Sequence, residues 1–75
     1  MGKIMDMDKE IGSLLRKYRE NKGYSLSQAG DLIGRTKSCI YYYETGRNAI
    51  DVKTLDKLCT VYGTDMYSFI EELKK

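Results

Sequence analysis

Side chains able to form hydrogen bonds with a polyanion gather between positions 25 and 53 of this 75-residue sequence. One group combines an amine, hydroxyls and phenols within a short stretch: Lys37, Ser38, Tyr41, Tyr42 and Thr45. A second group is basic or small and polar: Ser25, Ser27, Arg35, Thr36, Arg47, Asn48 and Lys53. The first group suits base edges in a major groove, and the second suits phosphate oxygens. These residue types indicate recognition by contact rather than bond making.

Catalysis and metal binding lack their usual residues. The chain has no histidine, which is the commonest general base and metal ligand. Cys39 and Cys59 are twenty residues apart without a second pair, which fits no zinc spacing, so we expect two reduced and mostly buried thiols. No nucleophile–base pair or phosphate loop is evident. We therefore expect no enzymatic activity, no metal, no cofactor and no small-molecule ligand.

Length and composition indicate one small domain. With 75 residues, of which 41% are hydrophobic and none is proline, the chain has material for a single modest core. Residues 1–7 show no clear periodicity and are expected to be a flexible arm, which leaves residues 8–75 as the domain. The sequence shows neither a signal peptide nor an apolar run of membrane-spanning length, so we expect a soluble, cytoplasmic protein without a membrane partner.

The distribution of charge is more informative than its sum. The formal net charge is only +2, but residues 16–53 carry eight basic and four acidic side chains, whereas the rest of the chain carries five and seven. A phosphate-facing surface requires such a local excess of positive charge. On charge alone, an ordinary solvated surface explains the pattern equally well.

The polar groups fall on two short predicted helices joined by a tight turn. Ser25 and Gln28 have the spacing of a capping box, which predicts a helix over residues 26–33 that ends at Gly34. Thr36 is a second N-cap candidate, and it predicts another helix over residues 37–44 that ends at Gly46. The short connection predicts a helix-turn-helix.

Apolar residues at helical spacing predict three more helices. Their expected spans are residues 8–22, 52–62 and 66–73, with N-cap candidates Asp8, Asp51 and Asp65. No strand signal competes seriously. We therefore predict an all-α fold of five helices.

Motifs in this order resemble those of the Cro and phage-repressor (XRE-type) family of helix-turn-helix proteins. The matching residues are Ile11-Gly12, Leu15, Tyr18-Arg19, Lys22-Gly23-Tyr24-Ser25-Leu26-Ser27, Gly34, Ser38, Ile40 and Glu44-Thr45-Gly46. The resemblance covers roughly residues 10–70 and implies a compact, lambda-repressor-like DNA-binding domain that usually dimerises and regulates transcription. It also implies that Arg19 and Glu44 form a salt bridge.

Helical geometry assigns the faces of the helix over residues 37–44. At about 100° per residue, Thr36 and Tyr43 lie on the same side as Ile40 and should face the core. The opposite side should face DNA and contains Ser38, Tyr41, Tyr42 and Thr45, which Lys37 can join. Packing of the three adjacent tyrosines in a core or a protein interface is the alternative.

Two classes of function remain open. The first is a sequence-specific regulator that binds double-stranded DNA, such as a repressor of phage, mobile-element or restriction-modification controller type, and reads a palindromic operator as a homodimer. The second is a protein-interaction module on the same fold, such as an antitoxin or anti-repressor. Surplus apolar residues near the C-terminus make Tyr67 and Ile70 the expected dimer contacts.

Overall fold

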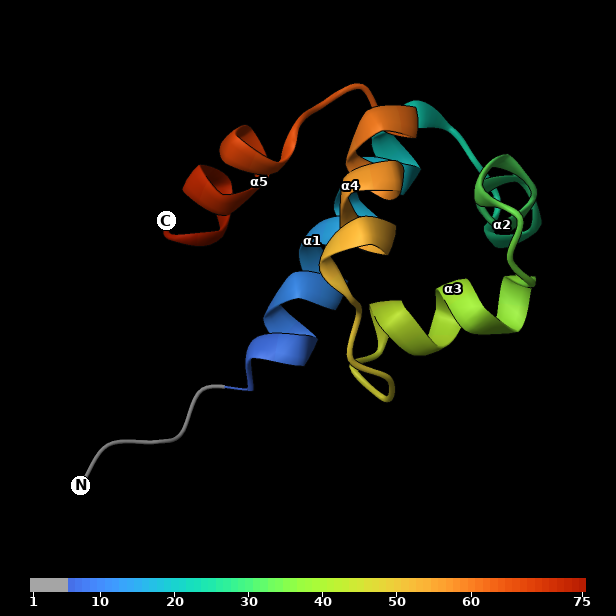
Figure 1. Cartoon of the computed structure of the whole chain (residues 1–75), viewed down its shortest axis with the longest axis horizontal. Coiled ribbons are helices and arrows are strands. Elements are labelled where there is room, and N and C mark those ends of the chain that lie inside the picture. The colour runs from blue at the N-terminus through green and yellow to red at the C-terminus, as the bar shows by residue number, and fades with distance from the viewer. Residues whose placement is uncertain (1–5) are drawn as a thin grey trace.

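The computed structural model describes residues 6–75, which form five α-helices (Figure 1). In chain order these are α1 (Met7–Lys22), α2 (Leu26–Ile33), α3 (Lys37–Glu44), α4 (Val52–Val61) and α5 (Met66–Leu73). The predicted all-α fold is confirmed. No helix in this part of the chain combines the length and the apolar character needed to cross a bilayer.

A polar side chain caps the start of every helix in residues 6–75: Asp6, Ser25, Thr36, Asp51 and Asp65. Each accepts a hydrogen bond from the backbone amide three residues later, which satisfies one of the free donors of the first turn. The Gln28 side-chain oxygen accepts from the Ser25 amide at 2.8 Å, so the predicted capping box is present.

The predicted N-cap of the first helix was wrong by two residues. Asp6, rather than Asp8, is the N-cap, because its Oδ1 accepts from the Lys9 amide at 3.2 Å and its carbonyl accepts from the Glu10 amide at 3.0 Å. Asp8 lies in the first turn, where its charge still complements the helix dipole. Residues 1–5 of the predicted arm lie outside the described residues, and Met7 belongs to α1.

The core lies where all five helices meet. Its most deeply buried side chains come from different helices: Leu15, Ala29, Ile40, Leu58, Cys59 and Phe69. Two aromatic pairs add to it, since the ring centroids of Tyr18 and Phe69 are 5.8 Å apart and those of Tyr24 and Tyr62 are 6.3 Å apart. Met66 packs against this cluster.

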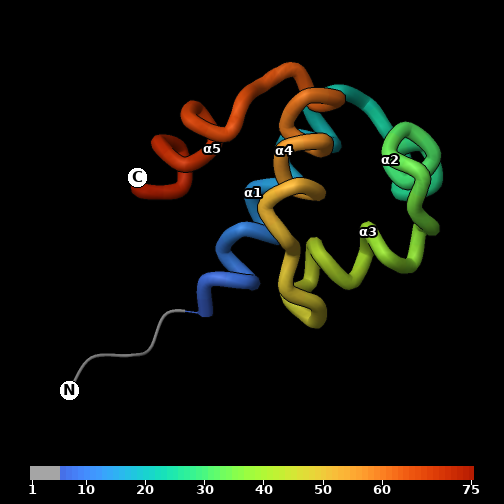
Figure 2. The backbone as a smooth tube through the Cα atoms, viewed as in Figure 1, coloured from blue at the N-terminus to red at the C-terminus, as the bar shows by residue number. Residues whose placement is uncertain are grey.

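Small residues let α3 approach its neighbours closely. A Cβ at Gly12 of α1 would collide with the carbonyls of Tyr43 and Glu44, and a Cβ at Gly30 of α2 would collide with the carbonyl of Arg35. α3 contacts both α1 and α2, while α5 packs on α1 and α4. Figure 2 shows the result: α2 and α3 occupy one end of the molecule and α5 the other.

Candidate nucleic-acid interface

A buried ion pair fixes α3 from its inward side. Arg19 of α1 donates to both carboxylate oxygens of Glu44, from Nε at 2.7 Å and from Nη2 at 3.0 Å, and its Nη1 donates to the Tyr24 carbonyl at 2.8 Å. The side chains are only 10% and 5% exposed. The hydrogen bonds to Glu44 raise the pKa of Arg19 above its ordinary value. The pair implied by the family resemblance is thus formed, and it ties the end of α3 to α1.

The opposite side of α3 is open to solvent. Lys37, Ser38 and Tyr41 are exposed, and Tyr42 and Thr45 are half-buried. Ile40, Tyr43 and Glu44 are buried on the other side. The structure therefore brings together on one face all five residues predicted to read bases.

Thr36 does not face the core, and that prediction was wrong. It is exposed, and its Oγ1 accepts from the Cys39 amide at 3.1 Å. As an N-cap it has an extended backbone, with φ −80° and ψ 160°. The helical angle of about 100° per residue does not extend to such a residue. Its place at the exposed start of α3 is compatible with the phosphate contact predicted for it.

The Thr45 hydroxyl forms a hydrogen bond within the protein at the end of α3. This hydroxyl donates to the Tyr41 carbonyl at 3.0 Å and lies 3.4 Å from the Tyr42 carbonyl. The backbone amides of Arg47 and Asn48 also donate to the Tyr42 carbonyl, at 2.9 and 3.3 Å. The donors thus hold the following loop against the helix end, and Thr45 keeps its methyl group and oxygen lone pairs for other contacts.

Aromatic and basic groups lie next to one another on this surface. The rings of Tyr41 and Tyr42 have centroids 6.0 Å apart, and the guanidinium carbon of Arg47 lies 5.4 Å from the centroid of Tyr42. This distance is in the range of a cation–π interaction. Arg47, Asn48 and Lys53 are exposed, so three of the predicted phosphate contacts are free to meet a ligand.

The turn between α2 and α3 carries the remaining predicted contacts. Ser25 and Ser27 are exposed at the start of α2, although the Ser25 hydroxyl oxygen already accepts from the Gln28 amide at 3.0 Å. Arg35 is directed toward α4, where its Nη2 donates to the Thr54 hydroxyl at 3.3 Å. A phosphate contact by Arg35 stays a prediction, and it would require the guanidinium to leave or share this bond.

Thr54, which accepts the hydrogen bond from Arg35, is also bonded to Asp51, the N-cap residue of α4. The Thr54 hydroxyl donates to Asp51 Oδ1 at 2.7 Å, and the Thr54 amide donates to Oδ2 at 3.2 Å. These bonds lower the pKa of Asp51 below its ordinary value. The turn is therefore joined to α4 through polar contacts, in addition to the core.

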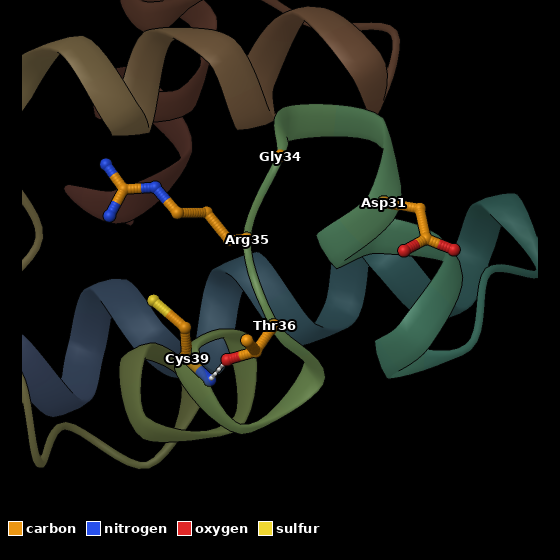
Figure 3. A pocket seen from close by; sticks show the side chains of 5 residues that line it. All are labelled: Asp31, Gly34, Arg35, Thr36 and Cys39. Carbon is orange, nitrogen blue, oxygen red and sulfur yellow. Dashed lines mark hydrogen bonds between the residues drawn. The ribbon is translucent and has the colours of Figure 1, made fainter.

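A shallow hollow of about 580 Å³ lies beside the turn and is lined by Asp31, Gly34, Arg35, Thr36 and Cys39. In Figure 3 the Arg35 and Cys39 side chains lie on one side of the turn and Asp31 on the other. Cys39 is only half-buried, in contrast to our expectation, because it lines this hollow beside the turn. Cys59 is buried as expected, and desolvation raises the pKa of its thiol to about 11.

Sequence reasoning did not place Arg16 in the site. A small hollow of about 140 Å³ between α1, α2 and α3 is lined by Arg16, Leu26, Tyr41 and Thr45, together with the Arg19–Glu44 pair. Arg16 also bonds to Glu20 at 3.0 Å. The available signal was its position three residues before Arg19, which places it one turn away on the side of α1 that meets α3. Within residues 6–75, no three His, Cys, Asp or Glu side chains lie close enough to hold a metal ion.

Two short helices joined at a tight turn, the second with an outward polar and aromatic face, define a helix-turn-helix protein. Residues 10–66 match the model of a helix-turn-helix domain family, and the chain belongs to that family. The resemblance to XRE-type proteins is thereby confirmed.

Similar proteins in two organisms are described as transcriptional regulators. The SPbeta prophage-derived uncharacterized HTH-type transcriptional regulator YonR of Bacillus subtilis is 40% identical over 53 residues. A putative HTH-type transcriptional regulatory protein of Saccharolobus solfataricus is 30% identical over 53 residues. Each alignment covers 71% of this chain but only 49% of YonR and 17% of the Saccharolobus protein. The likeness thus concerns this domain and not the full length of these relatives.

Solved structures share the fold. Two crystal structures of the clp gene regulator ClgR from Corynebacterium glutamicum match with TM-scores of 0.86 and 0.87. Each match covers 97% of this chain, and they cover 92% and 77% of the ClgR chains. Sequence identity is 19% in both, so the likeness shows a common five-helix arrangement and nothing about ligands.

Proposed function

We propose that this chain is a transcriptional regulator, and not an enzyme, that binds double-stranded DNA sequence-specifically through α3. The observation that carries the proposal is the outward face of α3 in a member of the helix-turn-helix family. The residues proposed to contact bases are Lys37, Ser38, Tyr41, Tyr42 and Thr45. Those proposed to contact phosphates are Ser25, Ser27, Arg35, Thr36, Arg47, Asn48 and Lys53.

A repressor acting on a palindromic operator is the more specific form of this proposal. YonR is described as prophage-derived, which favours a phage or mobile-element setting over a restriction-modification controller. One short helix contacts few base pairs, so useful specificity requires two copies on half-sites about one helical turn, roughly 34 Å, apart.

The exposed side of α5 is the surface that we propose for the homodimer. Tyr67 and Ile70 are 77% and 40% exposed. Beside Ile70 lies an apolar groove of about 450 Å³ that also includes Met7, with Glu10 and Lys74 among its lining residues. Apolar side chains flanked by charges of both signs suit a self-complementary contact across a two-fold axis.

Selection of bound sites from random duplex DNA tests the proposal most directly. We expect an enriched palindrome and an affinity that falls steeply as salt rises, because bound phosphates release counterions. A matched selection on single-stranded DNA serves as the control and should enrich nothing. Failure to bind any duplex at low salt would refute the proposal and favour the second candidate.

That second candidate is a protein-interaction module, such as an antitoxin or anti-repressor. The exposed apolar residues outside α3 favour it: Leu32, Val52, Tyr67 and Ile70. This candidate predicts no duplex binding and no dependence of partner binding on Lys37 or Arg47. The same salt titration therefore separates the two functions.

A further inference from the structure

Few side chains on the outward face of α3 can read a base through paired hydrogen bonds. The helix sequence KSCIYYYE contains no arginine, asparagine or glutamine. Its single acid, Glu44, is buried against Arg19. Guanine is usually read by Arg or Lys, adenine by Asn or Gln, and cytosine by Asp or Glu. Of these readers only Lys37, in the first turn, is available on α3.

Two adjacent aromatic rings stand out on the remaining face, beside the exposed Ser38 hydroxyl. Tyr41 is 49% exposed, and its ring lies 6.0 Å from that of Tyr42. Arg47 lies against the Tyr42 ring, and the Thr45 hydroxyl is bonded to the Tyr41 carbonyl, so Thr45 contributes a methyl group to the surface. We call the adjacent rings of Tyr41 and Tyr42 the tyrosine ridge.

Thymine is the base that presents an apolar group, its C5 methyl, in the major groove. The aromatic rings of this face, with the Thr45 methyl group, match this feature, whereas the face holds no Asn or Gln for paired hydrogen bonds to adenine. Resting on the proposed function, we infer that the tyrosine ridge reads thymine methyl groups. The preferred half-site is thus defined by thymines opposite Tyr41 or Tyr42, next to one position contacted by Lys37.

Replacement of thymine by deoxyuridine tests this inference, because it removes only the methyl group and leaves every hydrogen-bonding edge intact. Each thymine of the selected half-site is replaced in turn, and the dissociation constant is measured by fluorescence anisotropy. We expect about a fourfold loss of affinity at one or two positions, the effect of failing to bury one methyl group, and no effect at the others.

Two variants of each tyrosine assign the effect to its ring. Tyr41→Phe and Tyr42→Phe keep the ring and should keep the fourfold preference for thymine over deoxyuridine. Tyr41→Ala and Tyr42→Ala remove the ring. At least one of these variants should bind the thymine and the deoxyuridine duplexes equally. Leu32→Ala, at an exposed apolar residue of α2 outside the proposed DNA and dimer contacts, is the matched control and should retain the full preference. Circular dichroism confirms that each variant is folded.

The outcomes separate the inference from the proposed function. Salt-dependent, sequence-specific binding that ignores every thymine methyl would overturn the inference and leave the function intact. The inference is equally overturned if both alanine variants keep the preference for thymine. It is also overturned if both phenylalanine variants lose this preference, because the phenol hydroxyls would then contact the base. Absence of duplex binding would overturn the proposed function itself.

Discussion

Removal of the Glu44 carboxylate should strongly destabilise this domain. Arg19 makes three hydrogen bonds, and two of them go to Glu44. In Glu44→Ala the guanidinium would stay in its nearly closed site with only the Tyr24 carbonyl as acceptor. Breaking a buried pair on one side costs about 3–5 kcal/mol.

That cost is large for so small a domain. At roughly 0.05–0.15 kcal/mol per residue, the whole free energy of unfolding is only about 4–11 kcal/mol. A domain of this size loses about 4–8 °C of melting temperature for each kcal/mol, so the melting temperature should fall by at least about 12 °C. Thermal and urea unfolding followed by circular dichroism measure both quantities.

The surface pair between Arg16 and Glu20 supplies the control. Its side chains are 64% and 54% exposed and four residues apart on α1. Glu20→Ala should cost only about 0.3–0.5 kcal/mol, because water screens such pairs. If Glu44→Ala and Glu20→Ala change the free energy of unfolding by similar small amounts, the inward anchoring of α3 by this pair is refuted.

Three further predictions concern the DNA face, the dimer and the core. Lys37→Ala should lower the preference for the correct base at one operator position by about 1–3 kcal/mol, whereas Arg47→Ala should weaken cognate and random duplexes alike and flatten the salt dependence; equal losses on all DNA for both variants would contradict the division of roles. Changing Tyr67 and Ile70 together to glutamate should give a folded monomer in sedimentation experiments, with affinity for a full operator reduced to that for a half-site, and a persisting dimer would place the interface elsewhere. Burial raises the pKa of Tyr62 above its ordinary value, so the folded protein keeps a proton that the unfolded chain loses above about pH 10, and stability should fall as pH rises beyond that value. Tyr62→Phe should remove part of this alkaline loss in urea titrations at increasing pH, and identical profiles would refute the assignment.

The helices could be predicted because their signals are local. Ser25 and Gln28 specify a helix start within four residues, and Gly23 and Gly34 adopt the left-handed conformation, with φ of 77° and 72°, that ends a helix. Asp8 was the predicted cap of the first helix, whereas Asp6 has the extended backbone of the actual N-cap, and this conformation is not evident from the sequence. Boundaries were therefore less predictable than the helices themselves.

The site was predictable as far as helical periodicity reaches. The angular positions of Ser38 and Tyr41 within α3 predicted their exposure, but the same rule failed at Thr36, where the helix has not yet begun. Contacts between distant segments were harder to predict. Nothing local indicates that Arg35 bonds to Thr54, because that contact depends on how the turn meets α4.

The way α3 is held has an evolutionary consequence. Its anchors all lie on the inward side, in the Arg19–Glu44 pair and in the close approach that Gly12 permits. The side chains of Lys37 and Ser38, in contrast, are exposed at the start of the helix. Under the proposed DNA-binding role, we expect substitutions at these exposed positions to change the preferred DNA sequence with little cost in folding stability. On that proposal, a duplicated copy of this domain would acquire new DNA targets in a few substitutions, and the same positions would be open to laboratory selection for new DNA sequences.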